Sequence, residues 1–245
     1  MFEDVAALVQ EEPLDAVDPE VRGLLAAIGI RKDRPFAPDE RMNGILAEAA
    51  AVGNATARAI VFSTRDRDGY YYPDSAWKMA WIGNDPGFSP DGLLNLDART
   101  LYFYATQGVS PAMSITMVGI GSRYAYAEHD AAGRYLEGAK SYRLHLPPDV
   151  PAKELWAVTV YDPQTRSMLQ TDQQIPETSS HRKDVIINPD TSVDLYFGPE
   201  PPPGKEANSI QTILGKGRLV TMRLYGPLET WFDKTWRPGE IELVR

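Results

Sequence analysis

Two expected strands, residues 155–161 and 218–225, carry the side-chain pattern with the clearest chemical content. Successive side chains of a strand point to opposite faces, so the aliphatic side chains of each segment can share the core face. The opposite face would then carry hydroxyls, phenols and a guanidinium, and its ligand-binding candidates are Thr159, Tyr161, Arg223 and Tyr225. Because an arginine can bind a carboxylate through two parallel hydrogen bonds, this face could line a pocket for a polar or anionic ligand. The alternative is a solvent-exposed face with cross-strand Thr and Tyr pairs.

A carboxylate beside such a face would supply acid or base chemistry. The catalytic candidates are Asp162 and Asp172, which follow the first of the two strands. Glu177, Asp233 and Glu240 also stand near expected strand ends. Paired carboxylates hydrolyse glycosidic bonds, which makes a glycan-like substrate one interpretation. The alternative for each residue is a solvated side chain, which is the usual situation of Asp and Glu.

The sequence offers little for a metal or a nucleotide. It contains no cysteine and only three histidines, His129, His145 and His181, without a His-x-His or His-Glu-x-x-His pair. We therefore expect no metal site and no cofactor, and a solvated surface position for His145. The segment Gly119-Ile-Gly121-Ser-Arg lacks the third glycine and the following helix of a phosphate-binding loop, so a tight bend between strands is expected there.

Composition limits the partners and the location. The 245 residues carry a formal net charge of −9, which argues against nucleic acid or an anionic membrane surface as partner. No stretch approaches the roughly 18 apolar residues of a membrane helix, so no membrane insertion is expected. The N-terminus lacks the basic start and apolar stretch of a secretory signal. We therefore expect a cytoplasmic protein, or a periplasmic one if a leader has been removed.

The N-terminal region is expected to be helical. Apolar residues recur at helical spacing over 2–9, 21–28 and 42–56. Asp18 followed by Pro19 is typical of an N-cap and a first helical position. The following residues, 63–108, are rich in Gly, Pro and aromatic side chains, which predicts an irregular connection with one helix near its end.

From residue 109 onward, apolar side chains alternate with a period of two, which predicts strands. The expected strands are 114–118, 141–146, 155–161, 193–197 and 218–225. Short strands separated by turn signals favour an antiparallel sandwich over a parallel sheet. The predicted fold class is therefore α+β: an N-terminal helical region, residues 1–62, packed on a C-terminal antiparallel jelly-roll-like β-sandwich, residues 109–245.

Several segments, in order, resemble a bacterial domain of unknown function, the family numbered 1214. They run through Gly121-Ser-Arg-Tyr, Asp130-Ala-Ala-Gly-Arg-Tyr-Leu-Glu-Gly138, Trp156-Ala-Val-Thr-Val-Tyr161-Asp, Val193-Asp-Leu-Tyr-Phe-Gly-Pro199 and Phe232-Asp-Lys-Thr-Trp-Arg-Pro-Gly-Glu-Ile-Glu242. The resemblance implies a jelly-roll-like C-terminal domain and brings no settled activity, cofactor or catalytic residues. Many relatives carry a further domain upstream, numbered 1254, often behind an export signal. Without that domain this would be a naturally short member or a fragment.

One departure from the family bears on the site. Relatives usually have an Asn-Trp pair before the last strands, and this chain has Asn208-Ser209. If that tryptophan walls a pocket in relatives, the pocket here is wider or differently used.

Three functions fit these features, and the sequence leaves open whether the protein is an enzyme. The first is a small-molecule or glycan-like ligand-binding protein acting as a metal-independent hydrolase or lyase, in which the Tyr and Arg candidates position the substrate and one Asp candidate is the acid or base. The second is a non-catalytic binding or scaffolding module of the cell envelope. The third is a homo-oligomer with an interface at the aromatic tail, where Trp231, Phe232 and Trp236 suit buried contacts.

Overall fold

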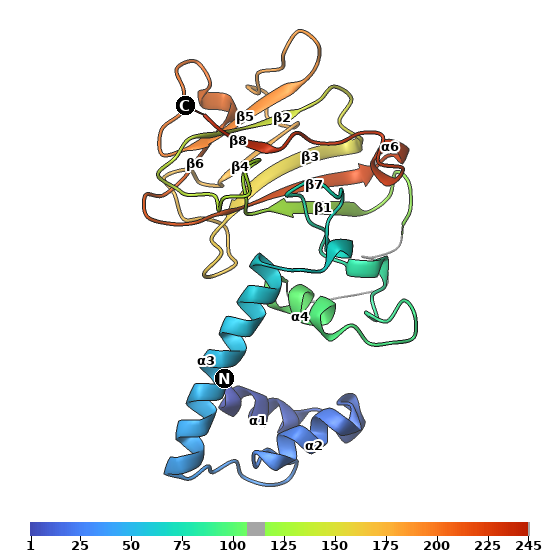
Figure 1. Ribbon diagram of the computed structural model, residues 1–245, viewed down its shortest axis with the longest axis vertical. Helices are drawn as coiled ribbons and strands as arrows, with labels where there is room; N and C mark the ends of the chain where they lie inside the picture. The colour runs from blue at the N-terminus through green and yellow to red at the C-terminus, as the bar shows by residue number, and fades with distance from the viewer. Residues whose placement is uncertain (107–115, 245) are drawn as a thin grey trace. The chain divides into compact units, whose positions relative to one another are not determined.

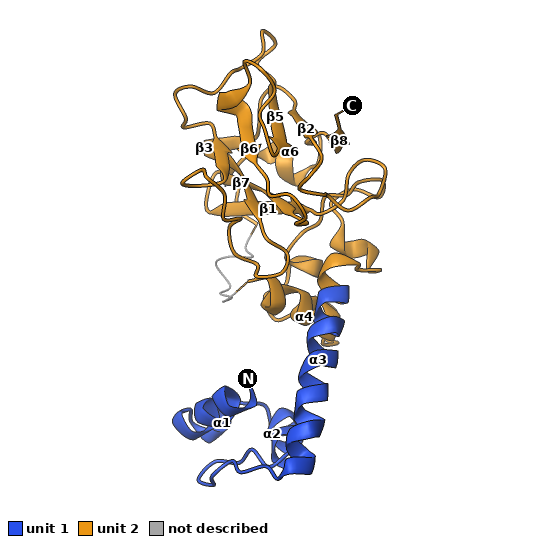
Figure 2. Cartoon of the chain, turned by 90° about the vertical axis from the view of Figure 1, so that its left-hand side faces the viewer, with its two compact units in different colours: residues 1–59 blue, residues 60–245 orange. Residues whose placement is uncertain are grey.

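The computed structural model describes residues 1–106 and 116–244 of the chain. Its contacts divide the chain into two compact units, residues 1–59 and 60–245 (Figure 2). The first unit is helical, and the second contains all the described strands together with short helices.

The helices of the first unit begin and end where local chemistry favours it. They are α1 (Phe2–Glu11), the 3-10 turn η1 (Leu14–Ala16), α2 (Pro19–Ala27) and the greater part of α3 (Glu40–Phe62). Asp18 caps α2, because its carboxylate accepts a hydrogen bond from the backbone N–H of Glu20 at 2.8 Å. Gly29 follows α2 with φ 93°, a left-handed conformation that glycine adopts easily. These boundaries agree with the helices that the sequence predicts.

By length and composition alone, α3 could cross a membrane, and it is the one helix of the described residues for which this holds. The sequence argument that no stretch approaches such a length was therefore too strict. Of the apolar window in α3, 22% is buried. Core helices of soluble proteins have similar compositions, so the finding is weak evidence, and the absence of membrane insertion stays a prediction.

Two four-stranded sheets form the body of the second unit (Figure 1). The first, in spatial order, consists of β1 (Ser122–Ala127), β7 (Leu219–Pro227), β3 (Ala152–Tyr161) and β4 (Glu177–Ser179). The second consists of β6 (Ser209–Gln211), β5 (Val193–Gly198), β2 (Tyr142–Leu146) and β8 (Ile241–Leu243). The named strands pair antiparallel except β5 and β6, which run parallel.

One apolar core lies between the two sheets. Val158 of β3 and Met222 of β7 enter it from the first sheet, and Leu144 of β2 and Leu195 of β5 enter it from the second. All four are fully buried, as alternation along the strands requires. The protein is therefore α+β, with N-terminal helices and two mostly antiparallel C-terminal sheets, as predicted.

The connection between α3 and β1 is ordered by a second apolar cluster. It contains the 3-10 turns η2 (Arg67–Gly69) and η3 (Ile82–Asn84) and the helix α4 (Leu96–Ala105). The Asn95 side chain caps α4 by accepting a hydrogen bond from the N–H of Ala98 at 2.9 Å. Trp81 packs against Tyr102 with ring centroids 4.5 Å apart, and both rings are buried. We call η3, α4 and residues 60–62 of α3 the helical cover.

The aromatic tail is anchored inside the second unit. Trp231, in the short helix α6 (Glu229–Phe232), is 3% exposed, and Trp236 is 7% exposed. The indole N–H of Trp236 donates to the carbonyl of Pro148 at 3.0 Å. These two side chains therefore belong to the core of their own chain and leave little surface for a contact between subunits.

One expected strand differs from the structure. Residues 116–118 lie in a loop and turn, and Ser114 and Ile115 fall outside the described residues. Gly119 and Gly121 each have φ 73° and form the expected tight bend, after which β1 begins at Ser122. Both left-handed conformations explain why glycine occupies these positions.

Candidate functional site

The outer face of the first sheet gathers polar side chains from four neighbouring strands. The strand register places Tyr124 opposite Arg223, and Thr221 between Tyr126 and Thr159. These positions alternate with core positions, so their side chains share the face turned away from the second sheet. We call this surface the tyrosine–arginine face; it consists of Ser122, Tyr124, Tyr126, Thr159, Tyr161, Glu177, Thr221, Arg223 and Tyr225. The structure thus brings together the four residues that the sequence suggests for ligand binding, and their role in binding stays a prediction.

Arg223 is held in place by its neighbours on this face. Its guanidinium carbon lies 4.0 Å from the ring centroid of Tyr225 and 4.9 Å from that of Tyr124. Its Nε and Nη2 atoms donate to the hydroxyl of Ser122 at 3.4 and 3.2 Å. Among the described residues, no carboxylate forms an ion pair with Arg223. The guanidinium of Arg223 is therefore oriented, half-buried and able to donate hydrogen bonds to an anionic partner.

Glu177 of β4 is the carboxylate of the tyrosine–arginine face. It pairs with Thr159 in the sheet register, and the Thr159 hydroxyl donates to its Oε2 at 2.8 Å. Burial and the charge of Glu177 raise the pKa of Tyr161, although Arg223 opposes this effect. The phenol of Tyr161 therefore stays protonated at neutral pH and can donate a hydrogen bond.

The two proposed catalytic aspartates do not lie beside this carboxylate, and their catalytic role stays a prediction. By the alternation of β3, Asp162 lies on the same side as the core residues Val158 and Val160, opposite to Thr159 and Tyr161. Its carboxylate accepts hydrogen bonds from Lys216 Nζ at 2.7 Å and from the backbone N–H of Gln164 at 2.7 Å. Burial would raise the pKa of Asp162, but these hydrogen bonds lower it, so the group acts as a fixed turn cap. Asp172 is exposed and accepts from the side chain of Gln211 at 3.0 Å, beside β6 of the other sheet.

A cavity of about 340 Å³ lies between the helical cover and the first sheet. Figure 1 shows α4 on the β1–β7 side of that sheet. The cover contributes mainly apolar side chains, and the sheet contributes phenols and a threonine; the lining residues are Val61, Phe62, Ala80, Trp81, Leu101, Tyr102, Ala105, Thr106, Tyr124, Tyr126, Tyr161, Arg166, Leu219 and Thr221. The volume and the mixture of an apolar wall with a few polar groups are typical of small-molecule sites.

Arg166 reaches the cavity from the loop after β3. The guanidinium carbon of Arg166 lies 4.3 Å from the ring centroid of Tyr104, and its Nη1 donates to the Tyr104 hydroxyl at 3.2 Å. The φ of Arg166 is 61°, a left-handed conformation that costs energy for a residue other than glycine. The turn that Asp162 caps holds this backbone, because the N–H of Arg166 donates to the Asp162 carbonyl at 2.7 Å.

Sequence reasoning missed the cavity and part of the face. Tyr124 and Tyr126 alternate with small residues in Ser122–Ala127, which was a usable signal for a strand with an aromatic face. Trp81 and the cover lie in a segment without periodicity, so no pattern pointed to their position over the sheet.

In comparison with known proteins, part of this unit matches a family model described as "Protein of unknown function (DUF1214)". Residues 121–229 match DUF1214. The match confirms the resemblance for that segment, which contains β1 through β7 and ends in α6. No curated protein matches the chain. The upstream 1254 domain of many relatives stays an expectation.

Two solved structures show limited similarity to the chain that carries this DUF1214 segment. The VPA0106 protein from Vibrio parahaemolyticus is 16% identical, with a TM-score of 0.47, over 100% of this chain and 55% of that protein. An uncharacterized protein from Burkholderia cenocepacia is 19% identical, with a TM-score of 0.35, over 56% of this chain and 34% of that one. The chain therefore spans about half the length of the first protein. Neither similarity supports an argument about function.

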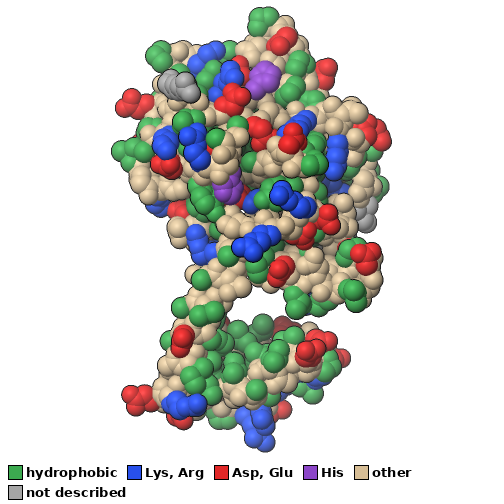
Figure 3. Space-filling model, in the orientation of Figure 1, with side chains coloured by type: hydrophobic (Ala, Val, Ile, Leu, Met, Phe, Trp, Pro, Cys, Tyr) green, Lys and Arg blue, Asp and Glu red, His purple; other side chains and the backbone are tan. Residues whose placement is uncertain are grey.

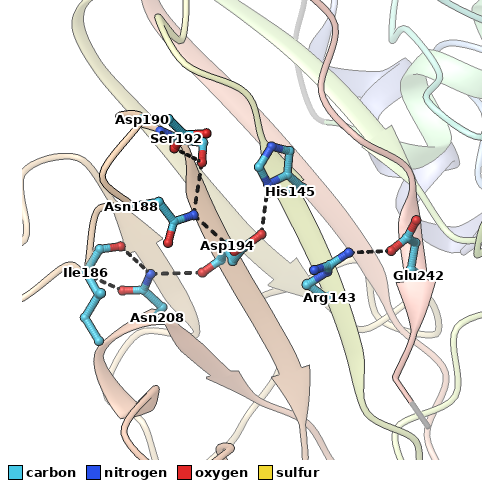
Figure 4. Close-up of polar contacts among 9 residues, drawn as sticks. All are labelled: Arg143, His145, Ile186, Asn188, Asp190, Ser192, Asp194, Asn208 and Glu242. Atoms are coloured by element: carbon cyan, nitrogen blue, oxygen red, sulfur yellow. Dashed lines mark hydrogen bonds and ion pairs between the residues drawn. The ribbon is translucent and has the colours of Figure 1, made fainter.

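The DUF1214 segment also carries a polar network on the second sheet, shown in Figure 4. Asp194 of β5 lies 2.9 Å from His145 Nδ1 and accepts from Asn188 Nδ2 at 3.1 Å. Asn208, at the end of the 3-10 turn η4 (Glu206–Asn208), donates to the backbone carbonyl of Asp194 at 2.9 Å and also holds Ile186. His145 is thus a surface residue with a fixed partner. Asn208 therefore connects the loop at Ile186 to β5 of the second sheet, away from the cavity. Its neighbour Ser209 is the position at which the chain departs from the family pattern.

Asp194 gives a pH-dependent contribution to stability. Burial would raise its pKa, but hydrogen bonds from His145 and Asn188 lower it. A carboxyl group with a lowered folded-state pKa stabilises the fold above its unfolded pKa of about 3.9, and this stabilisation is lost as pH falls through the lower value. We expect Asp194→Asn to lower the free energy of unfolding by about 1 kcal/mol at neutral pH, and by less as the solution becomes strongly acidic. Urea unfolding monitored by tryptophan fluorescence at both pH values measures this difference.

The matched control for that experiment is Asp91→Asn, because Asp91 is exposed. This variant should unfold like the parent at every pH. If Asp194→Asn lowered the free energy of unfolding equally in acid and at neutral pH, the effect would come from disturbed packing and not from the loss of a charge.

Proposed function

We propose that the second unit binds a small amphipathic molecule with an anionic group. The observation that carries this proposal is the cavity of about 340 Å³ whose lining includes Tyr124. The oriented guanidinium of Arg223 contacts the ring of Tyr124 from outside the lining, and no carboxylate of the described residues pairs with it. The apolar part of the ligand lies against Trp81, Leu101 and Ala105, and the anionic group reaches Arg223 across the rings of the face. The apolar lining favours an aromatic or aliphatic body over a glycan, whose hydroxyls would lose hydrogen bonds to water there.

The charges of the protein are compatible with a small anionic ligand and unfavourable for a polyanion. On the face shown in Figure 3, Lys and Arg side chains alternate with Asp and Glu across the second unit. With a net charge of −9, attraction of an anion depends on a local site such as Arg223 rather than on the field of the whole molecule. The absence of a nucleic-acid partner remains a prediction from the net charge. The absence of a cofactor and of a metal site remains a prediction from the composition.

A metal-independent hydrolase or lyase is the catalytic form of the same proposal. Glu177 supports it, because this carboxylate lies on the tyrosine–arginine face with Thr159 and Tyr161, where the sequence had suggested Asp162 or Asp172. Hydrolysis of nitrophenyl esters or glycosides that disappears in Glu177→Gln would establish this form. Absence of such turnover would favour the alternative proposal, a non-catalytic binding module. That alternative includes a role in the cell envelope and self-association.

We also propose that the second unit is a jelly-roll-like sandwich. Two four-stranded sheets with one core between them support this topology. The parallel pairing of β5 and β6 is a local departure from an all-antiparallel arrangement.

The binding proposal predicts a selective loss in Arg223→Met. The probes are anilinonaphthalenesulfonate and N-phenylnaphthylamine, which share an aromatic body and differ by the sulfonate. The variant should bind the sulfonate about tenfold more weakly, because charge-assisted hydrogen bonds are lost, while the uncharged probe keeps its affinity. Fluorescence titration measures both constants.

The matched control is Arg182→Met, since Arg182 lies in a loop and pairs with the nearby Asp184 at 2.7 Å. It should leave both titrations unchanged. Equal weakening of both probes in Arg223→Met would indicate a general disturbance of the site, and unchanged sulfonate binding would remove Arg223 from the proposal.

A further inference from the structure

Two residues of the cavity wall carry buried hydrogen-bond donors to which no described residue offers a partner. Among the described residues, the indole N–H of Trp81 and the hydroxyl of Tyr126 have no hydrogen-bond partner. Both atoms have almost no surface accessible to water, so a ligand reaches them only when the two side chains shift toward the cavity. The two side chains are each 8% exposed, and both line the cavity. Buried polar groups in folded proteins are nearly always paired, so two such donors at one cavity require an explanation.

The chemistry of both groups points in one direction. A tryptophan N–H can only donate. The pKa of Tyr126 is raised well above its ordinary value because of burial first, and then because of the charges of Glu128 and the neighbouring Tyr70. The phenol therefore keeps its proton over the physiological range and offers a donor as well.

We propose that the ligand of this cavity carries oxygen acceptors, as in a ketone, an ester or a carboxylate, which accept hydrogen bonds from Tyr126 and Trp81. This inference rests on the proposed function and narrows its ligand class. A site with unpaired donors binds an acceptor well and rejects an analogue that leaves the donors unpaired. Aromatic or aliphatic carbonyl compounds are thus favoured over hydrocarbons and over ammonium compounds of the same shape.

A structural role for the Tyr126 hydroxyl is the competing explanation. Lys78 and Glu128 form an ion pair beside it, with both side chains almost fully buried. The Nζ atom of Lys78 lies 5.9 Å from the Tyr126 ring centroid. Glu128 Oε2 is also buried without a partner among the described residues. If the hydroxyl serves this carboxylate, its removal lowers stability and leaves ligand selection unchanged.

The first experiment needs only the native sequence. Acetylnaphthalene and isopropenylnaphthalene have nearly the same shape, and the second has a CH₂ group in place of the ketone oxygen. Each is used to displace N-phenylnaphthylamine from the protein, followed by fluorescence. We expect the ketone to compete at a concentration about tenfold lower than the hydrocarbon. Equal competition by both compounds would overturn the inference.

The second experiment uses Tyr126→Phe and Trp81→Phe, with Tyr196→Phe of β5 as the matched control on the other sheet. In the two cavity variants the preference for the ketone over the hydrocarbon should fall about tenfold in total. Because this preference is a ratio measured within one variant, a change in the affinity for N-phenylnaphthylamine does not alter it. The control should keep the native preference. A lower melting temperature with an unchanged preference would assign the hydroxyl to Glu128 and overturn the inference.

The two proposals fail in distinguishable ways. If N-phenylnaphthylamine and anilinonaphthalenesulfonate both fail to bind the native protein, the cavity is not a ligand site and the proposed function falls. If they bind and the ketone shows no advantage, the proposed function stands and the acceptor inference falls.

Discussion

Gly138→Ala is expected to prevent the second unit from folding. A Cβ atom at this position would lie 1.9 Å from the backbone oxygen of Ile213 and 2.7 Å from that of Lys216. No rotation of a side chain relieves these contacts, because the opposing atoms belong to the backbone. The residue is also fixed on both sides, since its N–H donates to the Lys216 carbonyl at 2.7 Å and its carbonyl accepts from the Thr212 hydroxyl at 2.8 Å.

Because 1.9 Å is far below any contact distance and the backbone itself must move, the cost of this substitution should exceed the usual range for overpacked sites, about 1–3 kcal/mol, and approach the net stability of the fold. Small domains have net stabilities of only about 5–15 kcal/mol, so much of the protein would be recovered unfolded or aggregated. Urea unfolding followed by circular dichroism, together with the soluble yield, measures the effect.

Gly217→Ala is the control for the same strand pairing. Gly217 bridges the neighbouring Glu137, and a Cβ on it would lie 3.7 Å from Pro163 Cγ, an ordinary contact distance. This variant should fold with a change of about 0.5 kcal/mol. Similar stability of the two alanine variants would mean that the backbone around Gly138 moves apart readily, contrary to the close approach described above.

Ala105→Trp is expected to abolish binding in the cavity while preserving the fold. Ala105 lies at the end of α4, is half-buried and lines the cavity. An indole at this position fills space that the ligand needs, and the open side of the site lets the larger side chain enter without displacing the core. The affinity for anilinonaphthalenesulfonate should fall about a hundredfold, measured by fluorescence titration with correction for the added tryptophan.

Leu96→Trp provides the matched control on the same helix, because Leu96 is 56% exposed and lies at the other end of α4. It adds the same fluorophore away from the cavity lining and should bind the probe like the native protein. Undiminished binding in Ala105→Trp, with the control normal, would place the probe outside the cavity.

Local patterns in the sequence were sufficient for the faces of β3 and β7. Alternation in each strand separated Val158 and Met222 from Thr159 and Arg223, and the structure keeps this separation. Alternation does not show which strands are neighbours. For that reason β4, with three residues and no visible period, was not expected to bring Glu177 to this face.

The positions of the two catalytic candidates could not be predicted for a related reason. Asp162 precedes Pro163, and this pair is also a turn signal; in the structure the carboxylate serves the turn and Lys216. The sequence does not show which of these two uses such a carboxylate has. The cavity could not be predicted at all, since it depends on an aperiodic segment that folds over the sheet.

The place of β8 has a consequence for synthesis. Arg143 of β2 pairs with Glu242 of β8, which lies 99 residues further along the chain. Until the ribosome has released the end of this sequence, one edge of β2 has no partner, and Trp231 and Trp236 cannot close the core beneath it. Unpaired strand edges with apolar side chains are prone to aggregate. The nascent chain therefore depends on the synthesis of β8 to protect a strand made about a hundred residues earlier.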